Sequence, residues 1–519
     1  MSKRLTNKLK VVLLLGLGFL CGTSYVRPAH GVEQPNIVFV MIDDLGPEWV
    51  SCYGAEDIET PFIDELAATG MKFLNAYSMP QCTPTRATLL TGEYPFRHGW
   101  VNHWDVPRWG AGCHFDQKYN VTFARQLKSV GYTTGIAGKW QINDFRVQPN
   151  VLKEHGFVEW CMWTGFESQN PPSAERYWDP FVFQNVTGPG YDGPSSNIRP
   201  SQADISDVER TGQERQPATK RLIDGKAVGL GVAGTYEGQF GPDVYNAFCC
   251  DFVQRHRDGP FLLYYPMCLT HGPFVHTPDE PTVTGKLAQH KAMVRYTDTL
   301  IGRLVAAIDT AGVRERTILI VTTDNGTSVG ITGHMNGCAV RGGKGRVTEN
   351  GVRQPFIVSC PGTVPEGVET ECLTDFSDLL PTFCELAGAP LPQDVVIDGK
   401  SIAPVILGKV EDGPREWIMA MGHGPARQDE QGVRPVEDFT HRVIRDKRFK
   451  IHVSDDREIT ALYDLRDDPA EEENLIKSPL QVHQDAIKRL TAALESMPRQ
   501  DDRPRYDPTP PQRWDLQRQ

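Results

Sequence analysis

A short segment that begins at Cys82 contains the residue types with the clearest chemical meaning in the chain. Cys82 is followed by Pro84 and Arg86, and the apolar run after them ends at Gly92. Pro84 suits the first turn of a helix, where a missing N–H costs nothing, so we expect Cys82 at or just before a helix N-terminus. Arg86 then lies on the same face one turn later. A reactive group there lies close to the positive end of the helix dipole and to a guanidinium. This predicts a site that binds anions.

Two pairs of polar residues follow apolar runs that are typical of buried strands. The runs are Pro35–Ile42 and Thr317–Thr322, and the pairs are Asp43-Asp44 and Asp324-Asn325. Ligands gather beyond the carboxyl ends of strands in open α/β sheets, and adjacent carboxylates repel unless a cation lies between them. These positions therefore indicate a ligand site. The structural alternatives are a helix N-cap for the aspartates and simple packing for Cys82.

Composition and the N-terminus define the broad class of protein. The chain has 519 residues, 39% hydrophobic and 23% charged, which fits a globular protein, and its formal charge of −12 argues against a nucleic-acid partner. Residues 1–24 are expected to be a signal peptide, because four basic residues precede the apolar run Val11–Leu20 and small residues follow it. That run is too short to span a bilayer, so we expect a periplasmic or secreted protein without a transmembrane segment. Cys21 could in principle carry a lipid anchor, but Leu20 directly before it does not fit a lipoprotein cleavage site, so we expect no anchor there.

The order of predicted elements indicates an α/β domain followed by a smaller one. Strands alternate with helices over residues 35–410, which predicts a large, mainly parallel sheet flanked by helices. Residues 142–240 are rich in Pro, Gly, Ser and Asn and are expected to form a loop-rich insertion. Short strands and an amphipathic helix over residues 413–497 predict a small α+β subdomain. The proline-rich residues 498–519 are expected to be a flexible or surface-draped tail.

Six short motifs occur in an order that resembles the active site of the type I, formylglycine-dependent sulfatases. They are Asp43-Asp44, Cys82 with Arg86, Gly138-Lys139-Trp140, His271-Gly272-Pro273-Phe274, Asp324-Asn325-Gly326 and Gly342-Gly343-Lys344. The resemblance covers about residues 35–408 and continues at Glu349–Pro355, Asp398–Ser401 and Tyr463–Pro469. It implies the alkaline phosphatase superfamily fold and an arylsulfatase-like enzyme that hydrolyses sulfate esters.

The resemblance also implies two cofactors. Cys82 would be oxidised to Cα-formylglycine by a formylglycine-generating enzyme, and the hydrated aldehyde would be the nucleophile. Asp43, Asp44, Asp324 and Asn325 would bind one divalent cation, with an oxygen of the modified residue 82 as a further ligand. Carboxylate and amide oxygens suit Ca²⁺ or Mg²⁺, and the family favours Ca²⁺.

Further roles are carried over from the family by position. Lys139 and Lys344 would bind sulfate oxygens, Arg86 would orient the nucleophile, and His271 would contact the sulfate and protonate the leaving alcohol. Three carboxylates, one divalent cation and three basic side chains leave a net charge of about +2, which favours an anionic substrate.

One position departs from the family pattern. The family has a histidine two residues after the lysine of Gly-Lys-Trp, and this chain has Gln141. Glutamine donates a hydrogen bond but accepts no proton near neutral pH, so the base that assists sulfate release is open. His334 or a water molecule would replace it as the base, and His334 would also contribute to substrate binding. The alternative for His334 is an ordinary histidine of a surface loop.

The sequence thus predicts an exported sulfatase, with a sulfated carbohydrate as the expected substrate. Export and seven tryptophans between Trp100 and Trp178 favour that class, although these tryptophans also suit simple packing. Two alternatives remain open. One is a phosphodiesterase or phosphonate monoester hydrolase of the same superfamily, and the other is an unmodified, non-catalytic binding protein.

Overall fold

The computed structural model describes most of the chain after the N-terminal segment. The described residues are 34–102, 114–143, 145, 148–163, 176–186, 221–223, 226–228, 232–236, 238–422, 427–429, 432–434 and 439–508. The expected signal peptide, Cys21 and the last part of the expected tail lie outside them. Among the described residues, no helix has both the length and the apolar character needed to cross a bilayer. The ten cysteines in this part of the chain are all free.

A ten-stranded sheet forms the centre of the α/β domain. Its strands, in spatial order, are β14 (Val368–Asp375), β2 (Met71–Tyr77), β13 (Arg353–Ser359), β10 (Thr317–Thr323), β1 (Asn36–Ile42), β9 (Phe261–Pro266), β3 (Thr133–Lys139), β4 (Glu159–Trp163), β5 (Phe181–Asn185) and β8 (Val232–Thr235). The five strands from β10 to β4 are parallel, whereas β13 and β5 run antiparallel to both neighbours. The prediction of a mainly parallel α/β sheet is confirmed.

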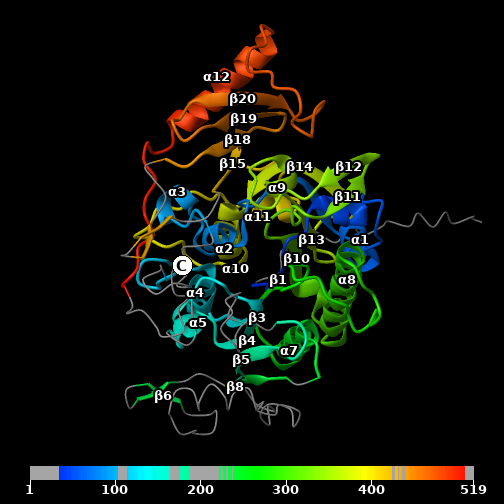
Figure 1. The fold of residues 1–519 in the computed structure, drawn as a ribbon. Helices are drawn as coiled ribbons and strands as arrows, with labels where there is room; N and C mark the ends of the chain where they lie inside the picture. Colours follow the sequence, from blue (N-terminus) through cyan, green and yellow to red (C-terminus); the bar gives the residue numbers. More distant parts are fainter. Residues whose placement is uncertain are drawn as a thin grey trace, which may run out of the picture. The chain divides into compact units, whose positions relative to one another are not determined.

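Helices cover both faces of this sheet (Figure 1). One layer contains α2 (Cys82–Thr91), α4 (Phe123–Ser129), α10 (Leu379–Ala387) and α11 (Ala403–Ile406), and the other contains α1 (Pro61–Ala68), α7 (Gly241–Arg255) and α8 (Lys286–Thr310). Alternate residues of β1 enter the two cores, with Phe39 on the α2 side and Val40 on the α8 side. Because both faces are buried, β1 has a continuous apolar sequence, as strands of covered parallel sheets do.

The segment expected to be a loop-rich insertion contributes strands to the sheet. Within residues 142–240, β4, β5 and β8 extend the edge beyond β3. These strands are four or five residues long and lack a polar–apolar alternation, so their sequences do not separate them from buried loops. Of the seven tryptophans, Trp100, Trp140, Trp160 and Trp163 are buried and pack in the interior. Trp178 is half-buried, and Trp104 and Trp109 lie outside the described residues.

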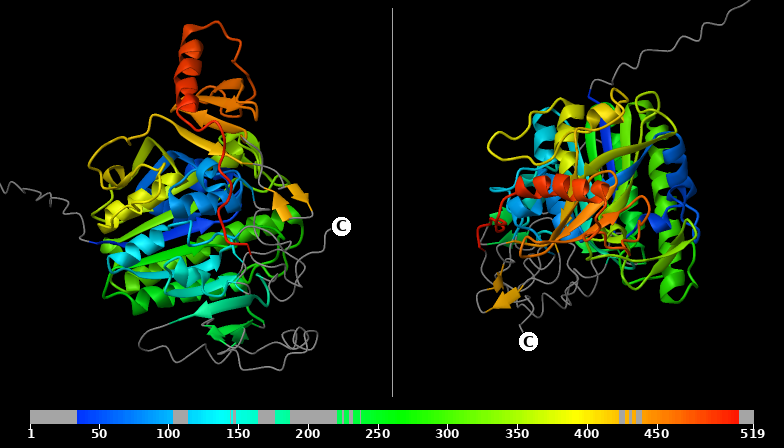
Figure 2. Two further views of the ribbon diagram at one scale, coloured as in Figure 1. Left: turned by 90° about the vertical axis from the view of Figure 1, so that its left-hand side faces the viewer. Right: turned by 90° about the horizontal axis from the view of Figure 1, so that it is seen from above.

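The C-terminal region forms an antiparallel sheet covered by one helix, as predicted. The strands are β15 (Ile418–Met421), β18 (Arg442–Arg445), β19 (Phe449–Val453) and β20 (Ile459–Asp464), and the helix is α12 (Gln481–Glu495). Leu490 and Leu494 of α12 pack in the same core as Ile444 and Ile451. Figure 2 shows the helix lying along this sheet.

Candidate active site

Four adjacent parallel strands bring most of the predicted site residues to one edge of the sheet. β10, β1, β9 and β3 are neighbours, so their carboxyl ends lie side by side. The residues at or after these ends are Asp324 and Asn325, Asp43 and Asp44, His271, and Lys139. Residues more than 200 positions apart in the sequence therefore meet because of strand order alone.

The two polar pairs are hydrogen-bonded to each other. The backbone N–H of Asp44 donates to Asp324 Oδ1 at 3.1 Å, and Asn325 Nδ2 donates to Asp44 Oδ1 at 2.7 Å. Asp44 has a φ of 61°, a left-handed conformation that aspartate tolerates better than most residues. All three carboxylates are buried. The predicted clustering of these four side chains is thus present in the structure.

Helix α2 begins at Cys82, as the sequence predicts, and its first turn is fixed to the same strand ends. Thr85 Oγ1 donates to the Asp324 carbonyl at 2.8 Å. Arg86 Nη2 donates to Asp324 Oδ2 at 2.9 Å, and Arg86 Nη1 donates to the Lys139 carbonyl at 2.8 Å. Arg86 is 1% exposed and Cys82 is 3% exposed. The cysteine therefore lies at a buried helix N-terminus beside a guanidinium.

Two lysines complete the positive side of the site. Lys139 Nζ lies 2.6 Å from Asp43 Oδ2 and 3.4 Å from Cys82 Sγ, and Lys344 Nζ lies 2.8 Å from Asp44 Oδ2. Gly138 brings the chain to this position with a φ of 112°, and a Cβ atom there would lie 2.0 Å from the Pro266 carbonyl oxygen. Glycine is therefore required directly before Lys139.

His271 lies at the rim of the same cluster. Its Nε2 is 3.6 Å from Asp44 Oδ2, and Arg176 Nη2 is 3.1 Å from its Nδ1 and also bonds to the Gly272 carbonyl. The Arg176 guanidinium lies over the Trp163 ring, 4.6 Å from its centroid. Sequence reasoning missed Arg176, because a single arginine in the expected insertion carries no local signal.

Burial and mutual repulsion shift the pKa values of the carboxyl groups in different directions. Burial is the largest effect on Asp43 and would raise its pKa, but Lys139, His271 and Arg86 together hold the pKa below the usual range. Burial, and then Asp43, raise the pKa of Asp324 to about 7, against the opposing charges of Arg86 and Lys139. Burial also raises the pKa of the Cys82 thiol to about 12. The unmodified thiol is therefore neutral near pH 7.

The donor set fits a hard divalent cation. Within the described part of the chain, the buried atoms Asp43 Oδ1 and Asn325 Oδ1 accept no hydrogen bond. Buried acceptors normally have partners, so two unpaired oxygens beside two further carboxylates suit a cation. One ligand atom each of Asp43, Asp44, Cys82 and His271 lies within 4.8 Å of the others. This grouping includes His271, which the sequence did not predict as a metal ligand.

The two remaining candidates differ in their position. Gln141 is buried with a φ of 75°, and among the described residues its Oε1 accepts no hydrogen bond. The side chain of His334 is 53% exposed, and its Nδ1 lies 2.8 Å from Asp57 Oδ2. His334 therefore has the surroundings of a surface histidine, the alternative that the sequence left open for it.

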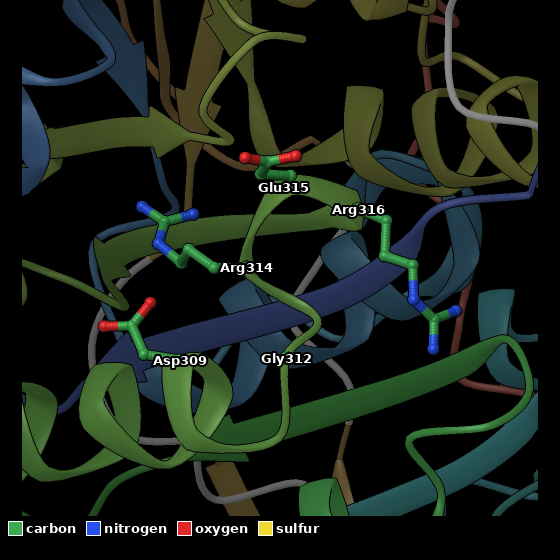
Figure 3. Close-up of a pocket in the computed structure, with 5 residues that line it drawn as sticks. All are labelled: Asp309, Gly312, Arg314, Glu315 and Arg316. Carbon is green, nitrogen blue, oxygen red and sulfur yellow. The ribbon is translucent and has the colours of Figure 1, made fainter.

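A cavity of about 490 Å³ lies away from these groups (Figure 3). It is lined by Asp309, Gly312, Arg314, Glu315 and Arg316, at the end of α8 and directly before β10 begins. The site residues follow the other end of β10. Arg314 Nη2 is bonded to Ser359 Oγ at 2.6 Å, so this guanidinium is held by the protein itself. The cavity is separate from the site described above.

The fold and the site together define an α/β enzyme that acts on an anionic ester. The model of the sulfatase family matches residues 35–389, and a second model, the C-terminal region of N-sulphoglucosamine sulphohydrolase, matches residues 343–500. The chain belongs to the sulfatase family, whose members are sulfuric ester hydrolases. The resemblance seen in the sequence is confirmed.

Curated relatives agree with this assignment, and solved structures share the fold. The chain is 31% identical to human arylsulfatase A over 490 residues, which cover 89% of the chain and 86% of the relative. It is 29% identical to N-acetylgalactosamine-6-O-sulfatase of Bacteroides thetaiotaomicron, over 93% of the chain and 98% of the relative. The crystal structure of Ps i-CgsB has a TM-score of 0.68 at 24% identity and covers 91% of the chain and 94% of its own. BT4656 in complex with D-glucosamine-2-N,6-O-disulfate has a TM-score of 0.62 at 20% identity, over 89% and 98%.

Proposed function

We propose that this sulfatase uses formylglycine, formed from Cys82, as its nucleophile. The observation that carries the proposal is the position of Cys82 at the buried N-terminus of α2, with Lys139 Nζ 3.4 Å from its Sγ. A thiol with a pKa of about 12 is a poor nucleophile at neutral pH, which favours a modified residue at this position. Conversion is an oxidation, and we assign it to a separate formylglycine-generating enzyme.

Asp43, Asp44, Asp324 and Asn325 would hold the divalent cation, with Ca²⁺ preferred and Mg²⁺ as the alternative. The unpaired oxygens of Asp43 and Asn325 support this assignment, because an all-oxygen donor set suits hard cations. When bound, the cation polarises a sulfate oxygen and the nucleophile and offsets the charge of the carboxylates.

The basic side chains provide the remaining functions. Lys139 and Lys344 bind sulfate oxygens, and Arg86 orients residue 82 from the next turn of α2. The positive charges of Lys139, Lys344 and Arg86 balance the negative charges of the three carboxylates. A bound divalent cation would therefore make the pocket positive, which suits an anionic substrate. Nε2 of His271 faces the cluster and donates a proton to the leaving alcohol. Gln141 donates a hydrogen bond to the modified residue 82.

A sulfated carbohydrate is the proposed substrate, and the proposed location is the periplasm or the exterior. The likeness to an N-acetylgalactosamine-6-O-sulfatase along nearly its whole length supports the substrate class. The basic and apolar composition of residues 1–24 supports export.

Mass spectrometry of the peptide that contains residue 82 tests the mechanism. We expect a mass lower than that of cysteine by the exchange of SH and one hydrogen for one oxygen. The same preparation is then assayed on sulfated glycans, aryl sulfates and phosphodiesters. Full sulfatase activity with unmodified cysteine would overturn the formylglycine assignment, and faster hydrolysis of phosphodiesters than of sulfates would favour the phosphodiesterase alternative.

A further inference from the structure

The motif that begins at Glu349 takes no part in the chemistry above, although its first side chain is buried. Glu349 is 8% exposed and begins the short helix α9 (Glu349–Val352). A buried carboxylate destabilises the fold unless it is paired and hydrogen-bonded. The partners of Glu349 therefore indicate why a charge is present at this position.

The partners come from β2 and from the C-terminal sheet. Oε1 of Glu349 accepts hydrogen bonds from Tyr77 and from Lys450 Nζ, the latter at 3.0 Å, and Oε2 accepts one from Arg445 Nη1 at 3.2 Å. The fully buried Lys450 also lies 3.1 Å from Glu471, whose Oε2 accepts the backbone N–H of Glu349 at 2.5 Å. We call these five residues the Glu349 cluster. Each of their charged groups has at least one partner.

The backbone of α9 contacts the loops that carry the site residues. The Gly351 carbonyl accepts the N–H of Gly326 at 2.9 Å, next to Asn325, and the Val352 carbonyl accepts the N–H of Ser78 at 2.9 Å, four residues before Cys82. A Cβ atom on Gly343, which precedes Lys344, would lie 2.5 Å from the carbonyl carbon of Asn350. The loop before Lys344 therefore lies so close to α9 that only glycine fits at position 343.

We propose that Glu349 and Lys450 are positioning residues, through which the C-terminal sheet holds Lys344 and Asn325 in place. A displacement of α9 would leave the buried carboxylate and ammonium without their partners, so the ion pair fixes the helix. The helix in turn holds the loops, because its carbonyls accept from Gly326 and Ser78. Asn350 Nδ2 of the same helix donates to the Arg341 carbonyl at 2.7 Å, in the loop that leads to Lys344. This role rests on the proposed function in one respect, namely that Lys344 binds sulfate.

The first test replaces Lys450 by methionine in the full-length enzyme, with Arg448→Met as the matched control. Arg448 forms a shorter ion pair in the same hairpin, 2.6 Å from Asp464 against 3.0 Å for Lys450 and Glu349, and its ion pairs are with Asp464 and Asp467 rather than with α9. We expect Lys450→Met to raise KM and the inhibition constant of inorganic sulfate about tenfold, with a smaller change in kcat. Arg448→Met should leave all three constants unchanged. A second variant, Glu349→Gln with Lys450→Met, removes both charges of the ion pair and should give the same rise. In it Arg445 keeps its bonds to the Asp446 and Lys447 carbonyls, and Glu471 keeps its bond to His452.

Hydrogen exchange supplies a readout that does not depend on activity. The amides of Gly326, Lys344 and Gly345 all donate to backbone carbonyls in or near the site, and we expect them to exchange faster in Lys450→Met. If both variants lose only thermal stability, while sulfate inhibition and exchange at these amides stay unchanged, the role is purely structural and the proposal is overturned. If these amides exchange faster but the wild type hydrolyses no sulfate ester, the positioning role stands and the proposed function fails.

Discussion

Two groups of buried charges in this protein differ in how completely their polar atoms are paired. In the active site, Asp43 Oδ1 and Asn325 Oδ1 have no hydrogen-bond partner among the described residues, and the pKa of Asp324 rises to about 7. In the Glu349 cluster both carboxylates are paired. Burial there would raise the pKa of Glu471, but Lys450 and His452 outweigh it and lower the pKa to about 2. We interpret the unpaired acceptors of the active site as a place for a ligand, whereas the paired groups of the Glu349 cluster hold the structure around it.

The largest expected effect comes from the nucleophile. Cys82→Ala should reduce turnover by more than about a thousandfold while the fold stays intact, because the change removes the reacting group and little packing. Cys384→Ala is the matched control, since Cys384 is also buried but belongs to α10 and packs in the hydrophobic core. Turnover should be measured together with the far-UV circular dichroism of each variant. Retention of a tenth of the wild-type turnover in Cys82→Ala would exclude the proposed mechanism.

Removal of two of the proposed metal ligands should abolish metal binding. We expect one divalent cation per wild-type chain and none in Asp44→Ala with Asp324→Ala, because too few oxygen ligands remain. Asp375→Asn changes a buried carboxylate that bonds to Tyr94 in another cluster, and it should retain the metal. Elemental analysis of the three proteins decides the question. Stoichiometric metal in the double variant would contradict the assignment of these ligands.

Lys344 and His271 should affect different parameters, which separates binding from proton transfer. Lys344→Ala should weaken every substrate about equally. His271→Ala should reduce kcat most for leaving groups of high pKa, since these need a proton, and least for activated aryl sulfates. The measurement is a series of sulfate esters with leaving groups of graded pKa. Equal losses along the series in His271→Ala would argue against its acid role.

Gln141 should make sulfate release slower than alcohol release. Its amide has no basic lone pair near neutral pH, so we expect a burst of alcohol in rapid-quench experiments, followed by slower sulfate release. Gln141→His should shorten this lag and add a titrating group to the pH profile. His334→Ala is the control and should leave the lag unchanged, because His334 pairs with Asp57. Simultaneous release of both products in the wild type would mean that another group supplies the base.

The smallest expected effect is on the pH dependence of protein stability. Replacement of Glu471 and replacement of Glu48 by glutamine should change this stability in opposite directions. The lowered pKa of Glu471 stabilises the fold above its unfolded value of about 4.3, and this contribution is lost as the pH falls towards 2. Glu471→Gln should therefore lower Tm at pH 6 but not near pH 2. Burial raises the pKa of Glu48 to about 7, so Glu48→Gln should gain stability relative to the wild type as the pH rises from about 4 to 7. Tm should be measured from pH 2 to pH 7 for the wild type and both variants. Parallel curves of Tm against pH for all three proteins would contradict both pKa shifts.

Elements with a strong pattern were predictable from the sequence, and elements that depend on distant partners were not. The apolar run at residues 35–42 predicts the bounds of β1 to within one residue, and Pro84 correctly predicts that α2 begins at or just after Cys82. β14 was missed, because its burial alternates irregularly along the strand and the register slips after Thr370. β4 and β5 were missed because short aromatic segments have the same composition as buried loops.

Site residues that follow a strand or begin a helix were predictable, because the local sequence indicates where strands end and helices begin. Asp43, Asp324 and Lys139 are of this kind, whereas their hydrogen bonds depend on the order β10-β1-β9-β3, which no single segment specifies. Arg176 and Lys450 could not be found in this way. Each acts on a residue about 100 positions away, His271 and Glu349 respectively.

The central position of β1 has a consequence for the order of events during synthesis. Asn36 contacts strand neighbours 225 and 281 residues further along the chain, so the middle of the sheet cannot close until most of the protein has been made. Until then α2 lacks the strand ends that bury it, and Cys82 is open to other proteins. In the finished molecule Cys82 is 3% exposed. An enzyme that converts Cys82, as proposed above, would therefore have to reach it in the nascent, incompletely folded chain. The interval before β10 pairs with β1 would then set the time available for the modification.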